Sequence, residues 1–187
     1  MPDAITLLEQ DHREVEQLFA EYEQGNDPEV LAQICDELTI HAQIEERIFY
    51  PAVAKLDGMR DLVEEGRREH GEVKQAIAAI EVAEYAGDID RHVQTIMQGV
   101  NHHVEEEEHE MFPKVREKME RPELGALGAE MDAMKQELMR DISVGSVGAP
   151  PVDVTRDELY EMAKEQDIPG RSAMTKDELA RAVRQDH

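Results

Sequence analysis

The sequence predicts an all-α fold: an antiparallel up-down four-helix bundle with an additional helix and a small C-terminal helix-loop-helix module. Three observations support this prediction. The chain of 187 residues is 40% hydrophobic and 34% charged, a composition that suits long amphipathic helices. Apolar residues recur at steps of three and four over most of the chain, as they do on the buried face of a helix. Short segments rich in Gly, Asp and Pro separate these periodic stretches.

Five long helices follow from this punctuation. Asp27 can cap the second helix, with Pro28 at its first position. Pro51 is expected to kink that helix near its end. The segment "LDGM" separates the second helix from the third, and "GD" opens the fourth. The predicted helices span residues 4–24, 28–56, 60–86, 87–120 and 122–140.

The chain is expected to divide into three parts. Residues 1–140 form the bundle with its fifth helix. Residues 141–153, "DISVGSVGAPPVD", have no periodicity and are typical of a flexible linker. Residues 154–187 contain two short helices, each opened by a capping box, "TRDEL" and "TKDEL".

Each of the first four helices carries one histidine on its apolar stripe. In the second and fourth helices a glutamate follows one turn later, and the stepping continues to Ile48 and Ala52 in the second and to Glu110 in the fourth. Buried polar side chains cost free energy unless something satisfies them. Six polar residues lie on these apolar stripes: His12, His41, Glu45, His70, His103 and Glu107.

The two halves of the bundle match as a repeat. "DHREVEQLF" aligns with "EHGEVKQAI", and "HAQIEERIFYP" aligns without a gap with "HVEEEEHEMFP". A single His-x-x-x-Glu is usually a surface hydrogen bond, and a single histidine on an apolar face is usually a core residue bonded to a neighbour. Six such residues in register on four stripes indicate a metal centre instead.

The ligand types narrow the choice of metal. Imidazole and carboxylate without thiolate suit iron, manganese or zinc. Two symmetry-related carboxylates suit two ions, each held by two histidines, with Glu45 and Glu107 bridging. Two iron ions are the first expectation, and a manganese or mixed-metal centre is the second.

These four segments resemble the ligand-bearing segments of the hemerythrin-like (HHE cation-binding) family, over roughly residues 4–118. The resemblance implies a four-helix bundle around a non-haem di-iron centre with an oxo or hydroxo bridge, held by the six residues above. Oxygen-carrying members have a fifth histidine one turn along the third helix, where this sequence has Lys74. Water or a further side chain could complete the coordination; the candidates are Glu69, Glu108, Tyr22 and Tyr50.

The lack of a fifth histidine shapes the expected function. Two open metal positions favour reaction with peroxide or nitric oxide, or oxygen sensing, over the carriage of dioxygen. We expect a protein that binds or turns over peroxide, dioxygen or nitric oxide, as in oxidative stress, with peroxide disproportionation or nitric oxide reduction as the candidate enzyme activities. A non-catalytic oxygen, redox or iron sensor and an iron-binding protein remain the alternatives. The other histidines, among them His92, His102 and His109, are not expected to bind the metals.

The formal net charge of −24 repels nucleic acid and anionic membranes. No apolar run approaches the ~18 residues of a membrane span, and the N-terminus lacks the pattern of a signal peptide. The single cysteine, Cys35, cannot form an internal disulfide, so a cytoplasmic location is expected. The bundle is expected to be a monomer or a homodimer.

The C-terminal segment resembles the small N-terminal helical module of the transcription termination factor Rho, which is similar to SAP-type modules. That resemblance implies contact with nucleic acid. From residue 152 onward, however, nine acidic residues outnumber six basic ones, which gives little affinity for phosphate. Contact with a partner protein is at least as well supported.

Overall fold

The structure, a computed structural model, describes residues 2–83, 85–147 and 164. Every regular element in these residues is helical, and they contain no β-strand. One compact unit spans Met1–Leu138 and a second spans Met139–His187. The predicted helix-loop-helix module and residues 148–153 of the predicted linker lie outside the described residues, apart from Lys164.

The first two helices begin where the sequence signals indicate, and the first also ends there, whereas the second ends at Ile44, twelve residues before the predicted end at residue 56. α1 spans Ala4–Gly25 and ends at Asn26, whose left-handed backbone (φ 49°) closes the helix. α2 spans Pro28–Ile44. The Asp27 side chain accepts a hydrogen bond of 2.8 Å from the Glu29 N–H, which confirms the predicted cap.

Two π-helical turns divide the predicted second and fourth helices at equivalent places. Each begins at a glutamate and leads into a short α-helix with a proline in its first turn. Proline has no N–H to give to the preceding turn, and a π turn accommodates one extra residue there. The remaining elements are η1 (Glu45–Phe49), α3 (Tyr50–Val53), α4 (Arg60–Glu81), α5 (Ala86–Glu106), η2 (Glu107–Met111), α6 (Phe112–Lys118) and α7 (Arg121–Val147).

The π turns shift the buried face by one residue. Beyond Glu45 the buried side chains are Phe49 and Val53, whereas Ile48 and Ala52 are partly exposed. Beyond Glu107, Met111 is buried and Glu110 is exposed. The predicted continuation of both stripes past the glutamates is therefore wrong, because uninterrupted α-helical stepping does not count the extra residue.

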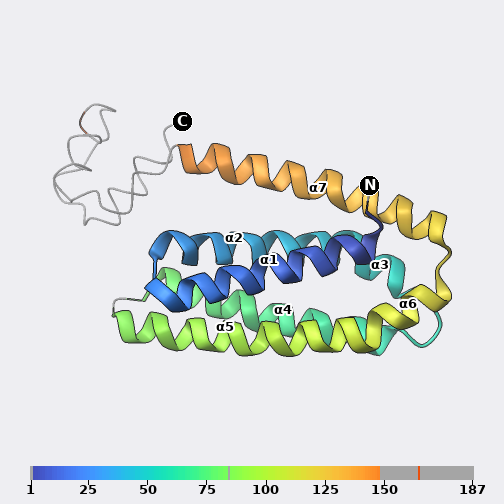
Figure 1. Cartoon of the computed structure of the whole chain (residues 1–187), viewed down its shortest axis with the longest axis horizontal. Helices are drawn as coiled ribbons and strands as arrows, with labels where there is room; N and C mark the ends of the chain where they lie inside the picture. Colours follow the sequence, from blue (N-terminus) through green and yellow to red (C-terminus); the bar gives the residue numbers. More distant parts are fainter. Residues whose placement is uncertain (1, 84, 148–163, 165–187) are drawn as a thin grey trace. The chain divides into compact units, whose positions relative to one another are not determined.

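The four long helices α1, α2, α4 and α5 lie side by side (Figure 1). α1 contacts α2, and α4 contacts α5. A buried apolar cluster fills the space between them; its members include Val15, Phe19, Ile34, Val93 and Ile96. The helices thus form a continuous apolar interior around the stripes that carry the histidines.

The part of α7 that lies in the first unit, up to Leu138, packs on α1. Its buried face carries Leu124, Gly128 and Met131. A Cβ at Gly128 would lie 2.7 Å from the backbone of residues 2–4, so only glycine permits this approach. α7 continues to Val147, seven residues past its predicted end, and α4 ends five residues before its predicted end. Among the described helices, none is long and apolar enough to cross a membrane.

Candidate metal centre

The structure brings all six sequence-predicted residues together inside the helices. The four histidines come from α1, α2, α4 and α5, and each is 5–7% exposed. Glu45 and Glu107 open the two π turns and are 0% and 1% exposed. π turns are frequent at functional sites, and here each one sets the position of a buried carboxylate.

The histidines form two pairs. The ring centroids of His12 and His41 are 5.0 Å apart, and those of His70 and His103 are 4.7 Å apart. The Nε2 atoms of His70 and His103 face each other at 3.1 Å. One pair therefore comes from the first helix pair of the repeat, and the other comes from the second.

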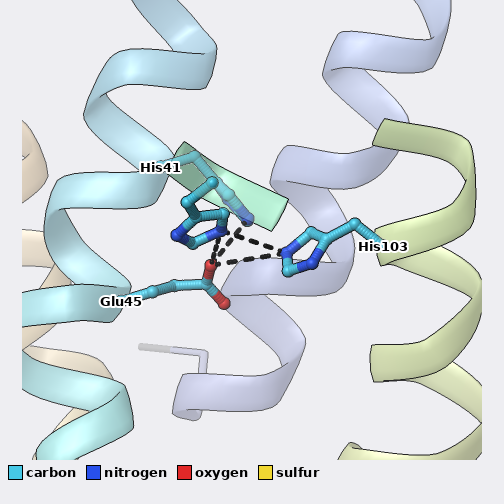
Figure 2. A group of neighbouring side chains, drawn as sticks. His41, Glu45 and His103 are labelled. Atoms are coloured by element: carbon cyan, nitrogen blue, oxygen red, sulfur yellow. Dashed lines mark hydrogen bonds and ion pairs between the residues drawn. The ribbon is translucent and has the colours of Figure 1, made fainter. Parts of the chain in front are cut away.

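Glu45 faces both histidine pairs. Its Oε2 lies 3.2 Å from His41 Nε2, 3.2 Å from His70 Nε2 and 3.9 Å from His103 Nε2. Figure 2 shows the side chains of His41 and Glu45, from one helix, converging with His103 from another. A carboxylate placed in this way can bind cations held by either pair.

Glu107 occupies the equivalent position in the second half. Its Oε2 lies 3.5 Å from His12 Nε2 and 3.6 Å from His103 Nε2, so it also faces one member of each pair. Its other oxygen, Oε1, accepts a hydrogen bond of 3.0 Å from the Tyr50 hydroxyl. Gly66 leaves room for this hydroxyl, because a Cβ there would lie 2.5 Å from Tyr50 Oη.

Many buried atoms of this cluster have no hydrogen-bond partner among the described residues. They include His12 Nε2, His41 Nε2, both oxygens of Glu45 and Glu107 Oε2. Buried polar atoms without partners are rare in proteins because they are costly. Two groups of residues in the cluster could each hold an ion, because the donor atoms within each group lie within 4.8 Å of one another. The first group is His41, Glu45, His70 and His103; the second is His12, His41 and Glu107. The residues present therefore fit a metal centre.

A second layer of carboxylates contacts the outer nitrogen, Nδ1, of each histidine. Such partners fix the tautomer and the ring orientation of a metal ligand. The Nδ1–oxygen distances are 2.9 Å for His12–Glu108, 3.7 Å for His41–Asp11, 3.1 Å for His70–Glu46 and 2.8 Å for His103–Glu69.

This layer changes the role of the additional ligands suggested by the sequence. Glu69 and Glu108 each contact the outer nitrogen of a histidine, and Tyr50 bonds Glu107. Tyr22 belongs to the apolar cluster. Sequence reasoning missed Asp11 and Glu46 altogether.

A signal for the missed residues is present in the repeat. In both copies an acidic residue directly precedes the first histidine, as Asp11 and Glu69 do, and another directly follows the glutamate, as Glu46 and Glu108 do.

The buried carboxylates of the cluster favour positive charge on their neighbours. Burial lowers the pKa of His41, but Glu45 and Asp11 outweigh burial and raise it to about 10. The pKa of His103 is likewise held well above its usual value, against burial, by Glu107, Glu45 and Glu69. Without a cation, these carboxylates therefore keep protons on the two imidazoles. Metal ions and protons compete for such nitrogens.

The charge count matches two divalent ions. Six carboxylates contact the four histidines, and Lys74 and Lys135 each pair with one of these carboxylates. With neutral histidines this leaves four negative charges. Lys74, four residues after His70, places its Nζ 2.6 Å from Glu46 Oε1 rather than in the ligand cluster.

A small cavity of about 30 Å³ adjoins the histidines. Its lining includes all four histidines of the cluster, the charged residues Asp11, Glu69 and Lys74, and apolar side chains such as Leu38, Val73 and Val100. A cavity of this size can hold one small molecule of a few atoms beside the histidines.

Comparison with known proteins places the fold and the cluster in context. The model of the hemerythrin HHE cation-binding domain matches residues 3–115. A protein from Nostoc sp. (strain PCC 7120) described as a DNA nickase is 29% identical over 148 residues, which cover 76% of this chain and 42% of the relative. This chain thus spans less than half the length of that relative.

A solved structure gives an independent comparison of the fold. The crystal structure of a hemerythrin HHE cation-binding domain-containing protein from Mycobacterium kansasii has a TM-score of 0.65 to this chain, at 22% identity. The match covers 97% of this chain and 99% of that one. At this identity, the likeness shows a shared fold.

Proposed function

The chain belongs to the hemerythrin HHE cation-binding domain family, and we propose that it is a non-haem di-iron protein that binds or turns over a small oxidant. The observation that carries this proposal is that each buried glutamate faces a histidine of both pairs. In this arrangement His12 and His41 would hold one ion, His70 and His103 would hold the other, and Glu45 and Glu107 would serve both.

The proposal includes the architecture that this centre needs. We assign α1, α2, α4 and α5 to an antiparallel up-down four-helix bundle, with α7 as the additional helix. Short connections between consecutive helices and their side-by-side packing support this assignment (Figure 1). The two iron ions would share the oxo or hydroxo bridge that the family resemblance implies.

The chemistry of the donor set supports iron. Four imidazoles and two carboxylates suit first-row transition ions, and two iron ions would supply the electrons for reduction of peroxide, dioxygen or nitric oxide. The chain's own residues bind and orient: the outer carboxylates hold the imidazole rings, and Tyr50 holds one oxygen of Glu107. The cavity beside the histidines leaves space for a small molecule.

A different function is described for the longer Nostoc relative, DNA nicking. The net charge of −24 opposes approach to a phosphate backbone, and the four histidines of the cluster are at most 7% exposed. A buried cluster in an acidic chain cannot reach a phosphodiester without opening the helices. We therefore favour a small ligand over DNA.

The experiment that tests the function adds peroxide, dioxygen and nitric oxide separately to the reduced, iron-loaded protein. Repeated evolution of oxygen from peroxide, or repeated consumption of nitric oxide, identifies an enzyme. One stoichiometric change in the visible spectrum, without turnover, identifies a sensor. Failure of all three molecules to change the spectrum of the iron-loaded protein contradicts the proposal and favours an iron-binding role. His92→Ala, a substitution at a histidine away from the cluster, is the matched control.

A further inference from the structure

We propose that Glu69, His102 and Glu106 form a separate cation site, which takes a divalent transition-metal ion from solvent and passes it to the buried centre. The site lies where α4 and α5 face each other, with Glu69 from α4 and the other two residues from α5. Its existence does not depend on the function proposed above, although its role as a loading site rests on the buried metal centre.

The three donor atoms have the spacing that a metal ion requires. His102 Nε2 lies 3.5 Å from Glu69 Oε1 and 3.5 Å from Glu106 Oε1, and all three atoms lie within 4.8 Å of one another. A separation of 3.5 Å is long for a hydrogen bond between nitrogen and oxygen. Metal–ligand bonds of about 2.1 Å at a tetrahedral angle place donor atoms roughly 3.4 Å apart. The spacing therefore fits a shared ion better than direct hydrogen bonds.

Glu69 provides a second, independent indication. Its residue exposure is 5%, and its Oε1 has no hydrogen-bond partner among the described residues. This oxygen is directed at His102, while the other oxygen, Oε2, bonds His103 Nδ1 at 2.8 Å. An unpartnered buried carboxylate oxygen is costly, and a cation at this place removes the cost.

The exposure of the other two ligands suits exchange with solvent. The side chains of His102 and Glu106 are 60% and 34% exposed. Three protein ligands leave room for water on the ion. One imidazole and two carboxylates favour Fe²⁺, Mn²⁺, Co²⁺ or Zn²⁺ over Mg²⁺ or Ca²⁺, which prefer oxygen ligands.

Glu69 joins this outer site to the buried one. The same carboxylate contacts His102 on one side and His103, of the buried cluster, on the other. An ion at the outer site is thus one side chain away from the centre it must reach. Because it has only three protein ligands, two of them partly exposed to solvent, the outer ion is held more weakly than the inner ones, as a loading site requires.

The test titrates Co²⁺ into the metal-free full-length chain, counting bound ions after gel filtration and following the rate of filling by visible absorption. The wild type is expected to bind a third, weaker ion beyond the two of the buried centre. His102→Ala and Glu106→Gln should each lose only this third ion and should fill the buried centre about ten times more slowly. His109→Ala, at another exposed histidine of the same helical run, should behave as the wild type does.

Each other result contradicts one part of the inference. A wild type without a third ion, or a third ion that persists in His102→Ala, overturns the site. Loss of the third ion with an unchanged filling rate overturns the loading role. Absence of the two inner ions from the wild type would instead overturn the proposed function, and the comparison of His102→Ala with the wild type would still decide whether the outer site exists.

Discussion

Lys135 Nζ lies 2.7 Å from Asp11 Oδ1, although 124 positions separate the two residues in the sequence. Asp11 directs its other oxygen toward His41 Nδ1, at 3.7 Å. Lys135 belongs to α7, outside residues 3–115 that the family model matches. A helix beyond the matched domain is therefore joined, through one carboxylate, to a histidine of the candidate metal centre.

Replacing this lysine should destabilise the protein. Lys135→Met removes the cation that pairs with Asp11, Glu14 and Glu37, and leaves His41 as the remaining positively charged partner of the buried Asp11. We expect a loss of about 2 kcal/mol in the free energy of unfolding, because removing one partner of a largely buried ion pair leaves part of the remaining charge uncompensated. Urea unfolding of the metal-free chain measures this loss.

Lys114→Met is the matched control for that experiment. Lys114 pairs with Glu110 at 3.6 Å, and both side chains are about half exposed. Its loss should change the free energy of unfolding by less than about 0.5 kcal/mol. Equal effects of the two substitutions would show that the contact between Lys135 and Asp11 is an ordinary surface pair.

Gly66 is expected to tolerate no side chain. In Gly66→Ala the new Cβ would lie 2.5 Å from Tyr50 Oη, so the tyrosine must move away from Glu107. We expect a destabilisation of about 1–3 kcal/mol despite the better helix propensity of alanine. Thermal or urea unfolding gives the value.

Gly71→Ala, on the same helix, separates the two effects. A Cβ at Gly71 meets nothing within 4 Å, so this change should stabilise the chain by about 0.5–1 kcal/mol. In a Gly66→Ala chain, Tyr50→Phe should recover part of the loss, because it removes the atom nearest to the new methyl group. An additive double variant would disprove the proposed clash.

Sequence reasoning reached the ligand cluster because helical stepping holds as far as the glutamates. On α1 the apolar residues at steps of three and four around His12 are all buried: Ile5, Leu8, Val15, Phe19 and Tyr22. The stepping fails beyond Glu45 and Glu107 because a π turn depends on how the following proline is accommodated, which periodicity does not reveal.

The sequence analysis also missed Lys135. It follows Met131 by one turn on the buried face of α7, so the same test for a polar residue on an apolar stripe would have found it.

The outer carboxylates should control how tightly metal is held. Glu108→Gln removes the charge that faces His12 Nδ1 at 2.9 Å. We expect metal affinity to fall about 10- to 100-fold, as it does when such partners of ligating histidines are changed. The rate of metal loss to a chelator measures the effect. Glu105→Gln, an exposed neighbour, should leave that rate unchanged.

Metal removal should lower stability. Six carboxylates converge on the histidines, and without ions they are neutralised only by two lysines and by protons on the imidazoles. The melting temperature should therefore fall on chelation and rise with added Fe²⁺ in a concentration-dependent manner. An identical melting temperature with and without metal would contradict binding to the folded state.

The number of iron ions per chain tests the central claim most directly. Purified wild-type protein loaded with Fe²⁺ without oxygen should hold about two irons per chain, as a dinuclear site in a helix bundle does. His41→Ala and Glu107→Ala, each measured after circular dichroism shows a helical fold, should fail to hold both. Fewer than about one and a half irons per chain with zinc in their place, or full iron content in either variant, would contradict the ligand set.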